Sequence, residues 1–71
     1  MELIVFDKEA GRDISDGDEL MILSGQDPRI GFESIAVQED KTIIICDKCG
    51  NFGYLSERYK IHIVIQGQTF A

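Results

Sequence analysis

Two cysteines separated by two residues are the sharpest chemical signal in the sequence. Cys46-Asp47-Lys48-Cys49-Gly50 has the spacing of a zinc knuckle, in which both sulfurs face one ion and the glycine permits a tight turn. Zinc prefers four ligands, and His62 is the one further soft donor that the chain offers. A dimer that contributes two thiolates from each copy is therefore one way to complete a zinc site at Cys46 and Cys49.

The same spacing has two other interpretations, a redox pair and a pair of unreactive thiols. A redox CxxC normally lies at a helix N-terminus in a βαβ unit, and the residues around Cys46 do not follow that pattern. We therefore expect two ordinary cysteines that flank a turn, with Cys46 buried as a small apolar side chain and no resident cofactor. Zinc at Cys46 and Cys49 stays as the alternative.

The formal net charge of −6 is concentrated in one part of the sequence. Residues 1–27 contain eight carboxylates and two cations, whereas residues 28–71 contain five of each. Such a surface repels phosphate and attracts basic proteins, which argues against direct binding of nucleic acid. We expect a basic protein partner to dock on the acidic stretch and on neighbouring aromatic side chains, with the candidate residues Asp7, Asp13, Asp16, Asp18, Glu19, Tyr54 and Tyr59.

Catalytic chemistry is poorly indicated. The crowded acids do not follow the DxDxDG order of a calcium loop, so they are expected to form a solvated turn. The serines have no nucleophile context, and no phosphate-binding glycine loop is present. A chain of 71 residues also has little room for a pocket of the usual size, roughly several hundred Å³. We therefore predict that the protein is not an enzyme.

The elements that position these residues must belong to one small domain, residues 1–71, because the chain is too short for a second core. The N-terminus is acidic and lacks the basic region of a secretory signal. No apolar run approaches the roughly 18 residues that a membrane-spanning helix needs. These observations predict a cytoplasmic protein that makes no membrane contact.

The apolar residues fall in short runs separated by Gly, Asp, Asn and Ser, which is typical of strands and turns. The run at 42–46 is strongly β-branched and is expected to be buried on both faces. The pattern therefore predicts an all-β fold, a small barrel of five or six strands whose closed sheet has no exposed edge strand. It does not determine how the segments 32–38 and 42–46 pair with the other strands. The predicted extended segments are 3–6, 20–23, 32–38, 42–46, 52–55 and 60–65, with turns at 39–41 and 47–51 and a single helical turn at 56–59.

Segments at both ends of the chain resemble the SH3-type barrel. Ile4-Val5-Phe6-Asp7 is similar to the opening ALYD strand, and residues 14–23 are similar to the diverging turn. Residues 53–61, Gly-Tyr-Leu-Ser-Glu-Arg-Tyr-Lys-Ile, resemble the GYxPSNYV segment. The resemblance implies an SH3-like barrel with one 3₁₀ turn before the last strand. It does not extend to PxxP binding, because the chain has no Trp and Ser56 replaces the proline of the turn.

A second resemblance concerns residues 11–20, Gly-Arg-Asp-Ile-Ser-Asp-Gly-Asp-Glu-Leu, which are similar to the GxxIxxGD opening of YopX-type phage proteins. It implies a phage or prophage accessory protein. Together with the charge pattern, it predicts a non-enzymatic protein-binding module that docks through its acidic N-terminal loop. Two alternatives stay open: an acidic inhibitor that mimics nucleic acid and blocks a DNA- or RNA-binding defence protein, and a zinc-knuckle assembly protein that uses Cys46 and Cys49.

Overall fold

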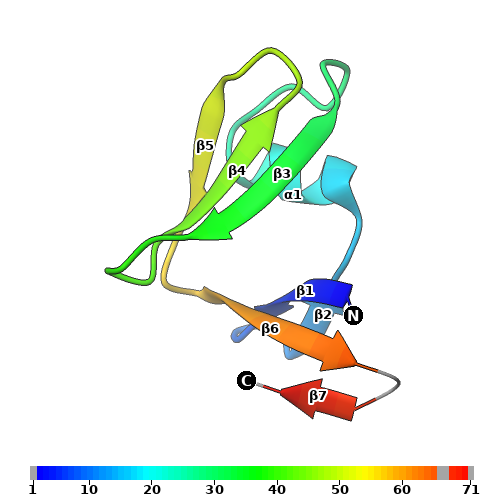
Figure 1. Ribbon diagram of the computed structural model, residues 1–71, viewed down its shortest axis with the longest axis vertical. Helices are drawn as coiled ribbons and strands as arrows, with labels where there is room; N and C mark the ends of the chain where they lie inside the picture. The colour runs from blue at the N-terminus through cyan, green and yellow to red at the C-terminus, as the bar shows by residue number, and fades with distance from the viewer. Residues whose placement is uncertain (1, 66–67, 71) are drawn as a thin grey trace.

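The computed structural model describes residues 2–65 and 68–70, which form a predominantly β fold with one short helix (Figure 1). The strands form two antiparallel sheets, with the orders β2-β1-β6-β7 and β3-β4-β5. Within the described residues the elements are β1 (Glu2–Asp7), β2 (Arg12–Ile14), α1 (Gly17–Leu23), β3 (Phe32–Val37), β4 (Ile43–Asp47), β5 (Phe52–Leu55), β6 (Tyr59–Ile65) and β7 (Gln68–Phe70). The predicted β class is thus confirmed in its coarse form.

The first sheet brings the two ends of the chain together. β1 runs antiparallel to β6, so that Val5 lies opposite Ile61 and Asp7 lies opposite Tyr59. β2 pairs with the other edge of β1, and β7 pairs with the other edge of β6. Among the described strands no ladder joins this sheet to the second one, so they do not form the single closed sheet that the sequence predicts.

The second sheet is a meander with β4 in the centre. The pairing that the sequence left open is an antiparallel β3–β4 hairpin, in which Ile35 lies opposite Ile45. Burial alternates along β4: Ile43 and Ile45 are buried, whereas Ile44 and Cys46 are only half-buried. The expectation of burial on both faces is therefore wrong, because one face of the meander covers the core and the other faces solvent.

The helix α1 corrects the prediction of a strand at 20–23. Asp16 caps the helix by accepting the backbone N–H of Asp18 at 2.9 Å, and acidic residues in the first turn complement the positive end of the helix dipole. Leu20 and Met21 are buried, whereas the following two residues of the helix are exposed. A run of four apolar residues fits a strand or a helix equally well, and the N-cap decides between them.

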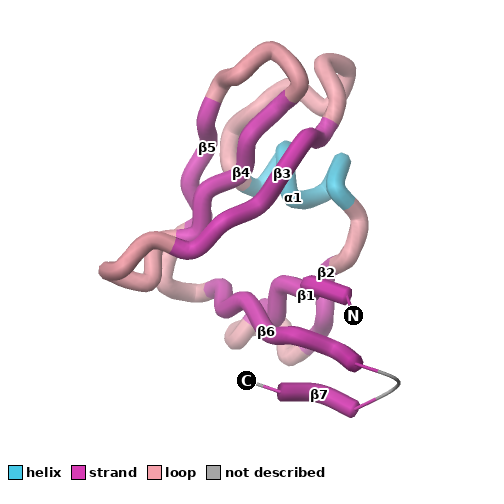
Figure 2. Tube along the Cα trace, viewed as in Figure 1, coloured by secondary structure: helices cyan, strands magenta, loops and turns pink. Residues whose placement is uncertain are grey.

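One core is shared by both sheets and the helix, because buried side chains from all of them form one cluster. Figure 2 shows α1 beside β3 and β4, against which it packs. Gly53 permits this close packing, because a Cβ atom at this position would lie 2.7 Å from the backbone oxygen of Ser24 at the end of α1. The buried apolar side chains of the core are Val5, Ile14, Leu20, Met21, Ile43, Ile45 and Leu55.

The predicted turns at 39–41 and 47–51 are confirmed, with Asp47 itself as the last residue of β4. At 56–59 a turn is present at residues 57–58, but it is not assigned as helical, and Tyr59 already belongs to β6. The loop between β3 and β4 is closed by the N–H of Gln38, which donates to the carbonyl of Thr42 at 2.9 Å. Lys41 in this loop has a φ of 72°, in the left-handed region. The turn before β6 is closed by the N–H of Tyr59, which donates to the carbonyl of Ser56 at 3.1 Å.

Candidate functional site

Asp7, one of the predicted docking residues, does not lie on the surface. Its side chain is buried at the end of β1, with 2% of the residue exposed. The carboxylate accepts hydrogen bonds from Nε and Nη2 of Arg58 at 2.7 and 2.8 Å, and from the backbone N–H groups of Glu9 and Ala10 at 3.1 Å. Because both oxygens are used inside the fold, assigning Asp7 to the docking surface is wrong.

The contact with Arg58 controls the ionisation of Asp7. The hydrogen bonds from the guanidinium lower the pKa of Asp7 from 3.8 to about 2, against the opposing effect of burial. The same contact raises the pKa of Arg58, whose Nε also lies 3.5 Å from a carboxylate oxygen of Glu9. Because this pair ties the end of β1 to the turn before β6, its role is structural.

Three of the predicted docking acids are exposed, and we call Asp13, Asp16 and Asp18 the acidic surface. They lie on β2 and at the start of α1, where Asp16 also caps the helix. Glu19 is half-buried and forms an ion pair with Arg12, which raises the pKa of Arg12. The acidic surface is therefore smaller than the sequence suggested, because the ion pair partly neutralises Glu19.

The predicted tyrosines lie on different parts of the molecule. Tyr54 is 57% exposed, whereas its neighbours Gly53 and Leu55 are buried on the side of the meander that faces α1. Side chains alternate along a strand, so Tyr54 points away from the helix and its acids. Tyr59 is half-buried, and its ring centre lies 5.5 Å from the guanidinium carbon of Arg58. The structure therefore separates Tyr54 from the acidic surface.

The turn that carries the two cysteines is organised by Asp47. Its buried carboxylate accepts the backbone N–H groups of Cys49 and Asn51 at 2.9 Å and the side-chain amide of Asn51 at 3.0 Å. Burial alone would raise the pKa of Asp47, but these hydrogen bonds outweigh it and hold the pKa below its usual value. The sequence predicts the turn at 47–51, but it does not indicate that the Asp47 carboxylate is buried and holds the turn.

Both cysteines are free thiols. Cys46 is half-buried on the solvent-facing side of β4, so the prediction that it is buried is wrong, and Cys49 is exposed in the turn. Among residues 4–61, whose side chains the structure describes, no group of three or more His, Cys, Asp or Glu residues is placed to hold a metal ion. The side chain of His62 lies outside the described part of the structure, so a zinc site at Cys46 and Cys49 stays a hypothesis.

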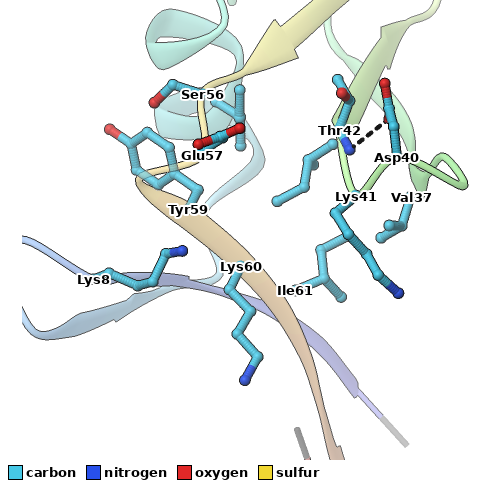
Figure 3. Close-up of a pocket in the computed structure, with 12 residues that line it drawn as sticks. Lys8, Val37, Asp40, Lys41, Thr42, Ser56, Glu57, Tyr59, Lys60 and Ile61 are labelled. Carbon is cyan, nitrogen blue, oxygen red and sulfur yellow. Dashed lines mark hydrogen bonds between the residues drawn. The ribbon is translucent and has the colours of Figure 1, made fainter.

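A groove of about 770 Å³ opens where β6 and the β3–β4 loop approach each other (Figure 3). The expectation that the chain has little room for a pocket of the usual size is therefore wrong. Tyr59 and Ile61 are half-buried along the groove, and the cations that line it are Lys8, Lys41 and Lys60. The carboxylate of Asp40 also lies here, but it accepts the backbone N–H of Thr42 at 3.0 Å, which lowers its pKa.

Sequence reasoning missed these lysines because they are far apart in the chain. Lys8 follows β1, Lys41 lies in the β3–β4 loop, and Lys60 belongs to β6. Only the pairing of β1 with β6 and the folding of the meander bring them to one groove. No local pattern in the sequence predicts this arrangement.

The structure is thus a small β-rich domain that carries a lysine-lined groove and, elsewhere, the acidic surface. No protein family model, no curated protein and no solved structure matches the chain. Within the described residues, none of the helical structure has the length and apolar character needed to cross a membrane.

Proposed function

We propose that the protein is a non-enzymatic, cytoplasmic protein-binding module that docks a basic partner through the acidic surface of Asp13, Asp16 and Asp18. The observation that carries the proposal is the distribution of ion pairs. Asp16 and Asp18 are exposed and have no cation beside them within the described residues. Four other N-terminal acids lie in ion pairs: Asp7 and Glu9 share Arg58, Glu19 pairs with Arg12, and Asp27 pairs with Arg29.

Negative charge that no nearby cation compensates mainly increases the rate at which the domain meets a basic partner protein. Exposed carboxylates attract a basic surface over about a Debye length, roughly 8–10 Å at physiological salt, and they keep away partners of like charge. Binding through the acidic surface should therefore weaken as salt is added.

The test is a fluorescence anisotropy titration with a labelled arginine-rich peptide. Replacing both Asp16 and Asp18 by Asn removes two charges and keeps the helix cap, since Asn caps as well as Asp. We expect this variant to bind the peptide about fivefold more weakly at low salt. The matched control replaces Glu33 and Glu39 by Gln, which removes two exposed charges elsewhere. Equal weakening in both variants would contradict a specific docking surface.

The alternative, that the protein mimics nucleic acid, is tested by a competition experiment in which a DNA-binding protein replaces the peptide. If the alternative is right, the protein and duplex DNA should compete for the DNA-binding protein. If both bind the DNA-binding protein at the same time, the partner contact is an ordinary protein interface and the mimic alternative is excluded.

The proposal includes an SH3-like topology and a phage or prophage accessory role. The topology is supported by the pairing of the first strand with β6, by the meander between them, and by the bond from Tyr59 to Ser56, whose three-residue span matches a 3₁₀ turn. The accessory role is supported by the resemblance of residues 11–20 to YopX-type proteins. An experimental structure with β1 paired to a different strand would contradict the topology, and a gene neighbourhood of housekeeping functions would contradict the role.

A further inference from the structure

The groove beside β6 gathers three of the four lysines in the chain. Figure 3 shows the side chains of Lys8, Lys41 and Lys60 projecting from three different segments in different directions, so their ammonium groups are spread out and do not meet at one point. The three arginines, in contrast, each form an ion pair with a carboxylate. Among the described residues, no hydrogen bond or ion pair within the fold holds any of the three lysine ammonium groups. These cations are therefore available to a ligand.

Lys41 occupies a backbone conformation that is costly for a lysine. Its φ of 72° falls in the left-handed region, where the loop between β3 and β4 would be better served by Gly or Asn. Its side chain makes no hydrogen bond or ion pair in the described structure that would offset this cost. A strained residue whose side chain has no partner within the protein indicates a role in binding another molecule and not in stabilising the fold.

The residues that line the groove besides the lysines indicate which class of ligand it can bind. Val37, Tyr59 and Ile61 also line the groove and present apolar surface to it, which suits an apolar side chain better than a compact ion. Asp40 and Glu57 also line the groove, and the whole chain carries a net charge of −6, so a dense polyanion such as nucleic acid is disfavoured. A peptide with a few spaced carboxylates matches both features.

We propose that this groove binds an acidic peptide segment of a partner protein, whose carboxylates contact Lys8, Lys41 and Lys60 and whose apolar side chains pack on Val37, Tyr59 and Ile61. The surface differs in position and in sign from the acidic surface of Asp13, Asp16 and Asp18. The two proposals are therefore independent, and either can fail without the other.

The test uses a fluorescein-labelled peptide in which Glu alternates with Leu and Ser, and a matched peptide with Gln in place of every Glu. The protein should bind the Glu peptide with an affinity that falls as salt rises, and it should bind the Gln peptide much more weakly. Lys41→Glu and Lys60→Glu should each weaken binding about fivefold. Lys48→Glu is the control, since it makes the same charge change at the exposed lysine outside the groove and should leave binding nearly unchanged.

Lys41→Gly separates ligand binding from folding. Glycine removes the left-handed strain, so the Tm should stay the same or rise while binding of the Glu peptide weakens. Three results would overturn the proposal: Lys48→Glu weakening binding as much as Lys41→Glu, the Gln peptide binding as tightly as the Glu peptide, or Lys41→Gly leaving binding intact. Tighter binding of a single-stranded oligonucleotide than of the Glu peptide would also overturn it.

Discussion

At the scale of single residues, two buried carboxylates show how this small fold tolerates charge in its interior. Asp7 is held by a guanidinium and two backbone amides, and Asp47 is held by backbone amides and the side chain of Asn51. A buried carboxylate stays ionised only when such partners replace its water. Both residues consequently stabilise turns through their hydrogen bonds, and neither carboxylate is available to bind a partner protein.

The hydrogen bonds of Asp7 predict a specific pH dependence. The pKa of Asp7 is lowered in the folded state to about 2, so its ionisation stabilises the fold above pH 3.8, and this contribution is lost as the pH falls toward 2. Asp7→Asn should therefore lower the Tm at neutral pH, and its difference from the unmodified protein should shrink over that acidic range. Thermal melts followed by circular dichroism at several pH values measure both effects.

Asp27→Asn is the control for this prediction, because the carboxylate of Asp27 pairs with the highly exposed Arg29. Exposed ion pairs contribute little to stability, so its Tm should change far less than that of Asp7→Asn. A difference between Asp7→Asn and the unmodified protein that stays constant down to pH 2 would show that Asp7 ionisation does not stabilise the fold.

At the scale of elements, α1 is a short helix whose formation depends on its cap and on its packing. Seven residues are too few for a stable isolated helix, so Leu20 and Met21 must be buried against the meander to hold it. The cap at Asp16 fixes where the helix begins, and thereby places Asp18 at the surface. The position of the acidic surface thus depends on the N-cap of α1.

Asp16→Ala should destabilise the protein by about 1 kcal/mol, because the N–H of Asp18 loses its acceptor. Asp16→Asn should leave stability nearly unchanged, since the amide oxygen takes over the bond. Urea denaturation curves of the two variants make the comparison. Equal losses in both would mean that the charge of Asp16, and not its hydrogen bond, supports the helix.

At the scale of the whole molecule, the two sheets have no ladder between them within the described residues and are joined through side chains. Val5 and Ile14 from the first sheet pack in one cluster with Ile43, Ile45 and Leu55 from the second. Met21 lies in the same cluster with no exposed surface. A shared core of this kind makes the sheets unfold together.

Met21→Ala should therefore destabilise the protein by about 2–5 kcal/mol and lower the protection of backbone amides in β1 and in β4 to the same extent. The neighbouring Ile22 is 60% exposed, so Ile22→Ala should cost less than about 0.5 kcal/mol. Native-state hydrogen exchange gives the residue-level measurement. Loss of protection confined to β4 would show that the sheets unfold separately.

The sequence by itself determined the β class, the positions of the turns and most of the strands. Alternation of apolar residues and the turn propensities of Gly, Asp and Asn act over a few neighbouring residues, so they can be read from the chain. The same local signals failed at 20–23, because an apolar run of that length does not distinguish a strand from a helix.

Tertiary structure alone decided which charges are buried and which are available. Asp7 looks like any other acid of the N-terminal stretch until Arg58, 51 residues away, is placed beside it. The three lysines of the groove are equally inconspicuous until β1, the β3–β4 loop and β6 meet. Burial and convergence depend on contacts between distant segments, and these contacts form only when the sheets assemble.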